Sequence, residues 1–331
     1  MKIKIIDYKN VKNLEKELLE TSEPKIIKNL FQHWKIIDIA RESSDLFLRK
    51  ILSYATTSHV DVLAIDKKYH GVIGYTDASF KNHTFVRHQA PLVAIIKKLI
   101  IEKDLSNTHD FALQSALISE CMPSFLQQNP SPDFLSRISP RLWLGTPTTV
   151  PGHYDSEHNI ALNACGKRTF FLLPGDQIEH VYPAPIDRAV TGPALSQVDF
   201  ETPDLTRFPA FAKAQNKLIS VTLNVGEALY IPPLWWHNVK SKDNVNALIN
   251  YWWQPESEKS SLESTDSLLH AILSIKNKSK AEKATWKAIF DYYIFSDKHD
   301  IYDSNLYEGI LSSCQSEDEE VIKTLKERIR K

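Results

Sequence analysis

The sequence predicts a mainly β fold with appended helices, and two observations support this prediction. From Arg141 onward the chain divides into short apolar or alternating runs, and Pro, Gly, Asn and Asp separate these runs, as is typical of antiparallel strands. Many short strands with turn signals favour a barrel or a sandwich. The runs are Leu142–Leu144, Ile160–Ala164, Thr169–Leu173, Leu218–Leu223, Ala228–Ile231 and Asn246–Trp253.

The first 139 residues predict additional mixed α/β structure that precedes this core in the sequence. Pro24–Lys28 is typical of a short strand. Elsewhere apolar residues recur at three- and four-residue intervals, which predicts helices. These helices are expected at Val11–Leu19, Ile36–Tyr54, Pro91–Lys103 and His109–Cys121.

Two further segments complete the predicted organisation. The proline-rich stretch Pro174–Ala214 connects two strands, and a connection of this length inside a domain is usually functional. After Pro255 the chain predicts a helical appendix. We therefore expect one domain over residues 1–255, with its core at about 140–255, and a helical region at 256–331 that forms a homodimer through its apolar faces. The predicted helices of this appendix are Leu262–Ser274, Ala281–Phe295 and Glu319–Arg330.

Composition excludes several classes of protein. Forty basic and forty-one acidic side chains leave a net charge of −1, so no overall field attracts nucleic acid or an anionic membrane. No apolar run approaches the length of a transmembrane helix, and no secretory leader begins the sequence. Cys121, Cys165 and Cys314 form no CxxC pair, so neither a disulfide framework nor a thiolate zinc site is predicted. A cytoplasmic protein is expected.

The residues His153, Asp155 and His237 predict a metal site. His153 and Asp155 are two positions apart, so in an extended chain their side chains point to the same face. His237, at the end of a Pro-Pro-Leu-Trp-Trp-His motif, supplies a third ligand. Two histidines and one carboxylate leave half of an octahedron open, which is typical of Fe(II) oxygenases. Coordination by His158 or Glu157 as a fourth ligand would instead indicate a metal-dependent protein of other chemistry.

Several motifs resemble those of a known family. The segments Gly226–His237, Asn250–Trp253, Ser196–Phe211 and Val150–Asn159 are similar to those of cupin-like JmjC oxygenases. In particular they resemble the factor-inhibiting-HIF type of asparaginyl hydroxylase and its bacterial relatives called cupin-like or "pass1-related". The resemblance covers about residues 20–255. It implies a double-stranded β-helix, the jelly-roll fold of cupins, in agreement with the strand pattern.

The resemblance also implies an activity and further site residues. It implies an Fe(II)- and 2-oxoglutarate-dependent dioxygenase that hydroxylates its substrate, with the three metal ligands named above. Asn159 and Asn250 occupy positions that contact the metal-proximal end of 2-oxoglutarate in the family. Arg168 stands where family members bind the distal carboxylate, and its planar guanidinium suits that task. Lys167 is the second candidate for this role.

Two positions depart from the family pattern and leave alternatives open. Val150 replaces a threonine, and Ala112 aligns with a tyrosine of an upstream helix, so both replacements remove hydroxyl groups from the expected co-substrate pocket. A non-catalytic binding module of the same fold is therefore a second hypothesis. The expected partners are dioxygen and either a protein side chain, a peptide or a small molecule. The remaining aromatic residues of these motifs are expected to pack in the core: Trp235, Trp236, Trp252 and Trp253.

Overall fold

A computed structural model describes residues 3–103, 109–189, 192–255 and 263–296. The chain forms two compact units, which divide between Trp253 and Gln254, close to the boundary expected at residue 255.

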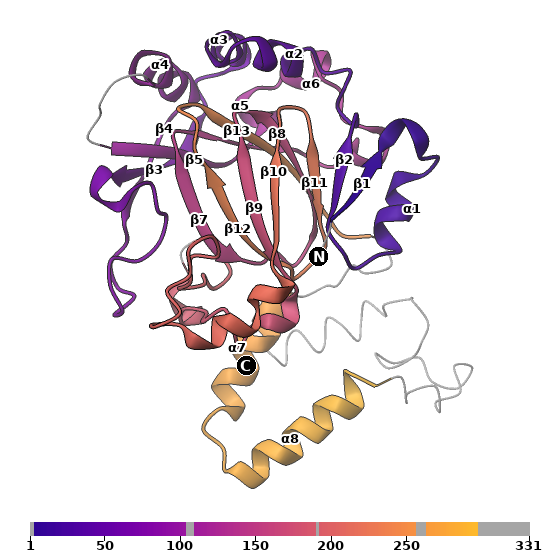
Figure 1. The fold of residues 1–331 in the computed structure, drawn as a ribbon, viewed down its shortest axis with the longest axis vertical. Helices are drawn as coiled ribbons and strands as arrows, with labels where there is room; N and C mark the ends of the chain where they lie inside the picture. The colour runs from indigo at the N-terminus through magenta and orange to yellow at the C-terminus, as the bar shows by residue number, and fades with distance from the viewer. Residues whose placement is uncertain (1–2, 104–108, 190–191, 256–262, 297–331) are drawn as a thin grey trace. The chain divides into compact units, whose positions relative to one another are not determined.

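The first unit is a double-stranded β-helix built from two facing sheets (Figure 1), which confirms the predicted fold class. The large sheet has nine strands in the order β1-β2-β11-β8-β13-β6-β5-β3-β4, and the small sheet has four in the order β10-β9-β12-β7. All neighbouring strands are antiparallel except β1 and β2. The strands are β1 Lys4–Asp7, β2 Lys25–Lys28, β3 His59–Asp66, β4 Phe85–Pro91, β5 His109–Leu117, β6 Arg141–Gly145, β7 Thr148–His153, β8 His158–Cys165, β9 Arg168–Leu173, β10 Ile219–Leu223, β11 Ala228–Ile231, β12 Trp236–Ser241 and β13 Asn246–Trp253.

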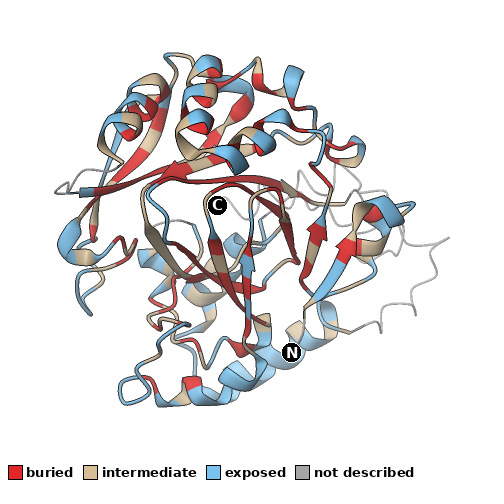
Figure 2. Cartoon of the chain, turned by 45° about the horizontal axis from the view of Figure 1, so that its top comes forward, coloured by how far each residue is buried: buried red, intermediate tan, exposed pale blue. Residues whose placement is uncertain are grey.

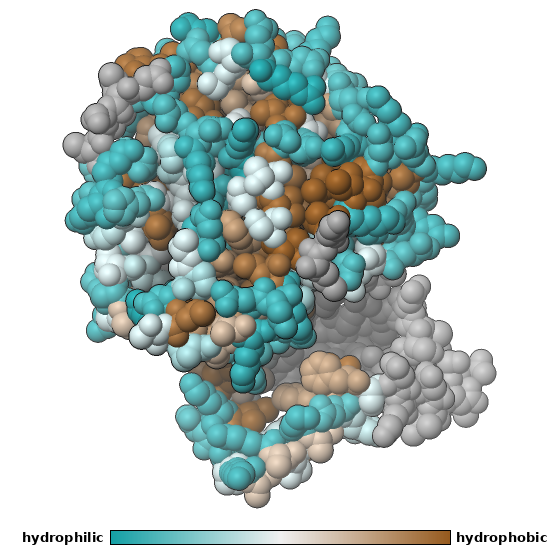
Figure 3. All heavy atoms as spheres, viewed as in Figure 1, coloured by the Kyte–Doolittle hydropathy of each residue, from teal (hydrophilic) through white to brown (hydrophobic). Residues whose placement is uncertain are grey.

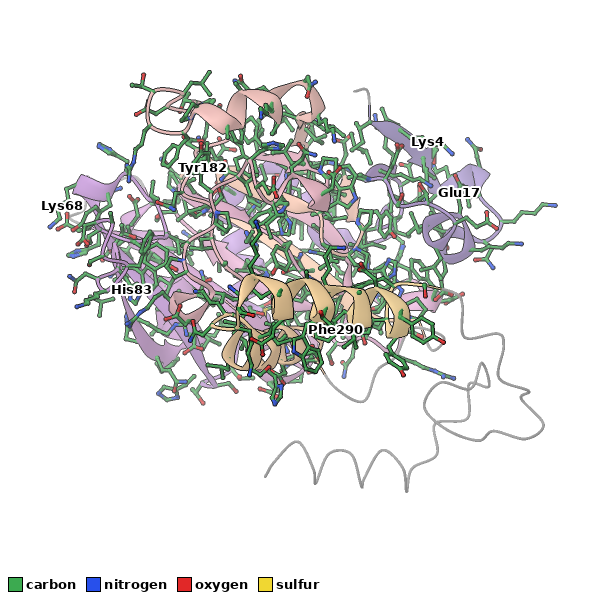
Figure 4. The ribbon with its side chains drawn as sticks, turned by 90° about the horizontal axis from the view of Figure 1, so that it is seen from below. Lys4, Glu17, Lys68, His83, Tyr182 and Phe290 are labelled. Atoms are coloured by element: carbon green, nitrogen blue, oxygen red, sulfur yellow. The ribbon has the colours of Figure 1, made fainter. Side chains whose placement is uncertain are left out.

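Helices cover the outer face of the large sheet. Their buried sides face the strands, whereas their outer sides are exposed (Figure 2), and their apolar residues join one continuous core with the sheet. Lys4 of β1 and Glu17 of α1 form an ion pair at 3.0 Å at one end of this layer (Figure 4). The helices of this unit are α1 Leu14–Leu19, α2 Lys35–Glu42, α3 Ser44–Tyr54, α4 Leu92–Glu102, α5 Ile118–Cys121 and α6 Phe125–Gln128.

A second core fills the space between the two sheets. It is lined by alternate residues of facing strands, such as Phe170 of β9, Val239 of β12 and Leu248 of β13. Apolar side chains of this region reach the surface between β10 and β2 (Figure 3). The interior of the barrel is therefore apolar, and any polar group within it needs a partner.

The long connection between β9 and β10 packs on the outer face of the small sheet. The apolar side chains between the connection and the sheet form a third core. Phe200, Phe208 and Phe211 of the connection pack on Phe171 and Trp236 of the sheet. The hydroxyl of Tyr182 accepts the backbone N–H of Ala210 at 2.9 Å and so joins two parts of the connection (Figure 4). Short 3-10 helices occur at Gly175–Gln177, Ile186–Arg188, Pro209–Lys213 and Gln215–Lys217.

The connection is also held by charge. Lys240 of β12 is buried, and its Nζ donates to Asp199 Oδ2 at 2.8 Å and to Glu201 Oε2 at 2.9 Å. The Lys240 hydrogen bond holds the pKa of Glu201 below its usual value, partial burial opposes this shift, and Lys242 adds to it. These ion pairs fasten the connection to the sheet beside the end of the barrel.

The structure corrects the prediction for His109–Cys121. This segment forms strand β5, and only Ile118–Cys121 is helical. A register shift between Leu113 and Ala116, with φ of 48° at Ser115, interrupts the alternation of the strand. Because of this bulge, apolar residues recur after two and then after three positions, which resembles the spacing of a helix. Consequently Ala112 lies on a strand and not on a helix, where it packs in a small cluster with Leu63 and Ile73.

Other sequence predictions for the first unit have mixed outcomes. The strands expected beyond Arg141 are confirmed, and so is the helix expected at Pro91–Lys103. The helix expected at Ile36–Tyr54 is two helices, because Ser43 ends α2 and caps α3 by accepting the N–H of Asp45 at 3.1 Å. The strands β1, β3 and β4 had not been predicted.

The second unit contains two described helices, α7 Ser264–Ile275 and α8 Lys280–Tyr293, close to the helices expected there. Ser279 and Glu282 form a capping box at the start of α8. The helix expected at Glu319–Arg330 lies outside the described residues. Across the described part of the chain, no helix is both long and apolar enough to span a bilayer.

Candidate metal centre

Strand pairing brings the two predicted histidine ligands together. His153 is the last residue of β7, and it is the direct partner of His237 in β12. Because the two residues are paired, their imidazoles lie together at the end of the small sheet, with ring centroids 4.1 Å apart. A register shift follows between His237 and Val239. One nitrogen of each histidine and one carboxylate oxygen of Asp155 all lie within 4.8 Å of one another.

Hydrogen bonds orient both imidazoles for coordination. His153 Nδ1 lies 2.9 Å from the carbonyl oxygen of Pro151, and His237 Nδ1 lies 2.9 Å from that of Trp235. A carbonyl oxygen can only accept, so each Nδ1 carries the proton and donates it. Of the two neutral tautomers, the one with the proton on Nδ1 has its lone pair on Nε2, which is the arrangement that metal-binding histidines show. Burial and the neighbouring His237 lower the pKa of His153 to about 4, so this imidazole is neutral at pH 7.

Asp155 is held in place from several sides. Its backbone oxygen accepts the N–H of Leu234 at 2.7 Å. Its Oδ2 accepts the indole N–H of Trp252 at 3.0 Å and the amide of Asn159 at 3.3 Å, and it lies 3.6 Å from His237 Nε2. A carboxylate oriented by such bonds can direct its remaining electron pairs toward a cation.

A narrow pocket leads from the three ligands into the barrel. Its volume is about 60 Å³, which suits a small ligand rather than a segment of a macromolecule. All six site residues predicted from the sequence line it, so the structure brings them together. The lining residues are Trp143, Val150, His153, Asp155, Asn159, Arg168, Phe170, His237, Val239, Leu248, Asn250 and Trp252.

Arg168 lies at the end of this pocket opposite the metal ligands. It is the first residue of β9, four positions before Leu172, which pairs with His237. Four residues correspond to roughly 13 Å of strand. Burial lowers the pKa of Arg168 to about 10, so the guanidinium is still charged at neutral pH, and its buried Nε has no partner. Lys167 is exposed and lines a different surface groove, so the structure favours Arg168.

The two predicted asparagines connect the metal ligands with the pocket. Asn250 donates from Nδ2 to Asn159 Oδ1 at 2.7 Å, and Asn159 in turn donates to Asp155. Both side chains are buried. Asn250 Oδ1 has no hydrogen-bond partner. This chain of amides orients the carboxylate ligand and leaves one acceptor in the pocket.

The geometry does not supply the fourth ligand of the alternative hypothesis. Within the described residues the cluster contains only the three predicted ligands. His158 is buried elsewhere: its Nδ1 hydrogen-bonds the hydroxyl of Tyr230 at 2.7 Å, and its ring stacks on Trp253.

Sequence reasoning missed two tryptophans of the site. Trp252 had been assigned to core packing, but its indole N–H contacts Asp155. Trp143 had not been considered, although its ring lines the pocket and contacts Trp252 edge-on at 6.1 Å. For Trp252 a signal was available, because it lies two residues after Asn250 and so shares the same face of the strand.

Comparison with known proteins decides the family. The family model of the cupin-like domain matches residues 11–259, well over half of the chain. The chain belongs to the cupin-like family. Members of this JmjC cupin family include Fe(II)- and 2-oxoglutarate-dependent oxygenases.

Named relatives of this cupin-like protein share only part of their length with it. It is 36% identical over 120 residues to "Lysine-specific demethylase JMJ30" of Arabidopsis thaliana, covering 36% of this chain and 27% of the relative. It is 35% identical over 119 residues to human "HSPB1-associated protein 1", covering 35% and 24%. It is 39% identical over 100 residues to "JmjC domain-containing protein D" of Dictyostelium discoideum, covering 30% and 21%. The matches thus span about a quarter of each relative.

The residues present fit Fe(II) and 2-oxoglutarate. Two imidazole nitrogens and one carboxylate oxygen are the donors that an Fe(II) oxygenase uses. Beyond them lie a buried arginine with an unpartnered Nε and an unpartnered amide oxygen. A small anionic chelator in the pocket would give Arg168 the partner that it lacks.

Proposed function

We propose that this protein is an Fe(II)- and 2-oxoglutarate-dependent oxygenase. The observation that supports this most directly is the pairing of a His-Asp-His cluster with a buried cation at opposite ends of one narrow pocket. When bound, iron with 2-oxoglutarate and dioxygen supplies oxidation of an unactivated C–H bond, coupled to decarboxylation of the 2-oxo acid to succinate and CO2.

The side chains of the site have separate tasks in this proposal. His153 and His237 would bind the metal through Nε2, because their Nδ1 protons are donated to backbone carbonyls. Asp155 supplies the negative charge, held by Trp252 and Asn159. Arg168 binds the distal carboxylate of the co-substrate.

The remaining pocket residues orient the co-substrate and exclude water. Asn250 carries a free amide oxygen beside the metal-proximal end of the pocket. The apolar side chains of Val150, Phe170 and Leu248 form the walls. Because the pocket is this small, a bound co-substrate would fill it and would leave no room in it for the group to be oxidised. That group belongs to a protein side chain, a peptide or a small molecule.

The decisive experiment reconstitutes the full chain anaerobically with Fe(II) and then adds 2-oxoglutarate and air. We expect succinate to form. Asp155→Ala should abolish succinate formation and bound iron while leaving the melting temperature nearly unchanged. Glu157→Ala is the matched control, because this acid lies two residues away and outside the cluster, and it should keep both properties.

Two outcomes would contradict the proposal. If Asp155→Ala still forms succinate, the site is assigned wrongly. If the wild-type chain binds no iron, the non-catalytic binding module becomes the better hypothesis. Loss of iron in Glu157→Ala would support the metal-dependent cupin of other chemistry with a fourth ligand.

A further inference from the structure

Unpartnered polar atoms are concentrated in the metal pocket. Among the described residues, seven buried side-chain nitrogen or oxygen atoms lack a hydrogen-bond partner. Three of them belong to residues that line this one pocket: Trp143 Nε1, Arg168 Nε and Asn250 Oδ1. Leaving a buried donor unpaired is unfavourable, so such a cluster indicates a ligand with matching groups. Two of the three atoms are donors.

Strand register places Trp143 toward the deep part of the pocket. Trp143 of β6 pairs with Leu248 of β13, two residues before Asn250 and four before Trp252. Since Trp252 contacts Asp155, the backbone of Trp143 lies on the side of Asn250 away from the metal ligands, and its ring packs edge-on against that of Trp252. Two residues of strand correspond to about 6.6 Å. Relative to the metal ligands, the position of Trp143 therefore lies toward the same end of the barrel as Arg168.

Few other donors are available there. The indole of Trp252 is engaged by Asp155. Away from the metal ligands and the two asparagines, the pocket is lined by apolar side chains apart from Trp143 and Arg168, namely those of Val150, Phe170, Val239 and Leu248. A carboxylate has two oxygens, each able to accept from a different donor. A guanidinium and an indole N–H together match such a group.

We propose that the indole N–H of Trp143 donates to the distal carboxylate of the 2-oxo acid, beside Arg168. Val150, which lines the same pocket, has no group that could donate to this carboxylate. Trp143 is then a specificity residue, because it contributes only when the ligand carries a second carboxylate. This inference rests on the proposed function and adds to it a second donor for the distal carboxylate, besides Arg168.

The test compares two ligands on the Mn(II)-loaded full chain by isothermal titration calorimetry. 2-Oxoglutarate carries the distal carboxylate, and 2-oxopentanoate has the same chain length without it. Trp143→Phe keeps an aromatic ring and removes the N–H. We expect the affinity for 2-oxoglutarate to fall about 10- to 100-fold, as for a hydrogen bond to a charged group, while the affinity for 2-oxopentanoate is unchanged. Equal losses for both ligands, or no loss for either, would overturn the inference.

Phe170→Leu is the control for packing. It alters an apolar wall of the same pocket without removing a polar atom, so both ligands should weaken by the same factor. A second measurement needs no variant at position 143. In the Zn(II)-loaded wild-type chain with 15N-labelled tryptophan, one indole N–H resonance should move downfield with 2-oxoglutarate and stay in place with 2-oxopentanoate. No ligand-specific shift would count against the inference.

The two ligands also separate this inference from the proposed function. A wild-type chain that binds neither ligand contradicts the proposed function itself. A wild-type chain that prefers 2-oxoglutarate, but loses none of this preference in Trp143→Phe, keeps the proposed function and refutes the role of Trp143. Equal affinity of the wild-type chain for both ligands refutes the distal-carboxylate site as a whole.

Discussion

Replacing Gly152 by alanine is expected to destabilise the fold beside the first metal ligand. An added Cβ at Gly152 would lie 2.4 Å from Cζ of Phe200 and 2.9 Å from both ε carbons of that ring. Phe200 is 1% exposed, and its ring centroid lies 5.3 Å from that of Phe211, so the ring has no free space to move into. Either the ring or strand β7 must shift, and His153 follows directly in the chain.

The expected magnitude follows from overpacking in a close-packed core. Such insertions cost about 1–3 kcal/mol. For a domain of this size 1 kcal/mol lowers the melting temperature by about 2–4 °C, so Gly152→Ala should lower it by about 2–12 °C. Differential scanning calorimetry measures this change, and titration with Mn(II) measures the accompanying loss of metal affinity.

Two further variants make the reasoning refutable. Gly74→Ala is the matched control, because an added Cβ there meets nothing closer than 3.8 Å, so stability should stay the same or rise slightly. Adding Phe200→Leu to Gly152→Ala should recover part of the lost stability, since the ring that the Cβ meets is gone. If Gly152→Ala is as stable as the wild-type chain, Phe200 does not cover this strand as described.

Three other predictions concern different parts of the chain. Trp252→Phe removes a hydrogen bond to the carboxylate ligand and should weaken metal binding about 10- to 100-fold in a Mn(II) titration. Glu201→Gln should be less stable than the wild-type chain at pH 7. Because the folded pKa of Glu201 is lowered, the stability difference is present above its ordinary value of 4.5 and should disappear as the pH falls through the folded pKa. Leu273→Glu, on a residue of α7 that is 84% exposed, should weaken the homodimer proposed for the second unit, as sedimentation velocity would measure.

Each of these predictions can fail in a recognisable way. Unchanged Mn(II) affinity in Trp252→Phe would show that Asp155 keeps its orientation without the indole. A stability difference in Glu201→Gln that does not vary with pH would mean that the side chain stabilises by packing rather than by charge. A wild-type chain that sediments as a monomer, or a dimer unaffected by Leu273→Glu, would contradict the proposed role of α7.

The three residues of the His-Asp-His cluster could be named from the sequence because their spacing depends on local geometry. The spacing of His153 and Asp155 predicted that their side chains lie close together, although β7 ends at His153 and Asp155 follows the strand. His237 is the strand partner of His153. Asn250 stood out because an amide in a buried strand requires a partner, and it has one in Asn159. Residue types and spacing named three of the residues that line the pocket, and the resemblance to a known family added Asn159, Arg168 and Asn250.

The parts that could not be predicted depend on pairing between distant segments. Strand β5 imitates a helix because a bulge at Ser115 breaks its alternation, and nothing local marks that bulge. The role of Trp143 follows from its register with Leu248, more than a hundred residues later. Ala112 aligned with a pocket residue, but in the structure it packs against Leu63 and Ile73 instead.

The position of the two histidines on neighbouring strands has one more consequence. β7 is the outermost strand of the small sheet, and β12 is its only partner strand in that sheet. An ion held by His153 and His237 would therefore link the outermost strand of the small sheet to its neighbour at the open end of the barrel. Metal-free and metal-loaded protein should then differ most in how readily amide hydrogens of this rim exchange with solvent, since a ligand that binds only the closed form opposes opening.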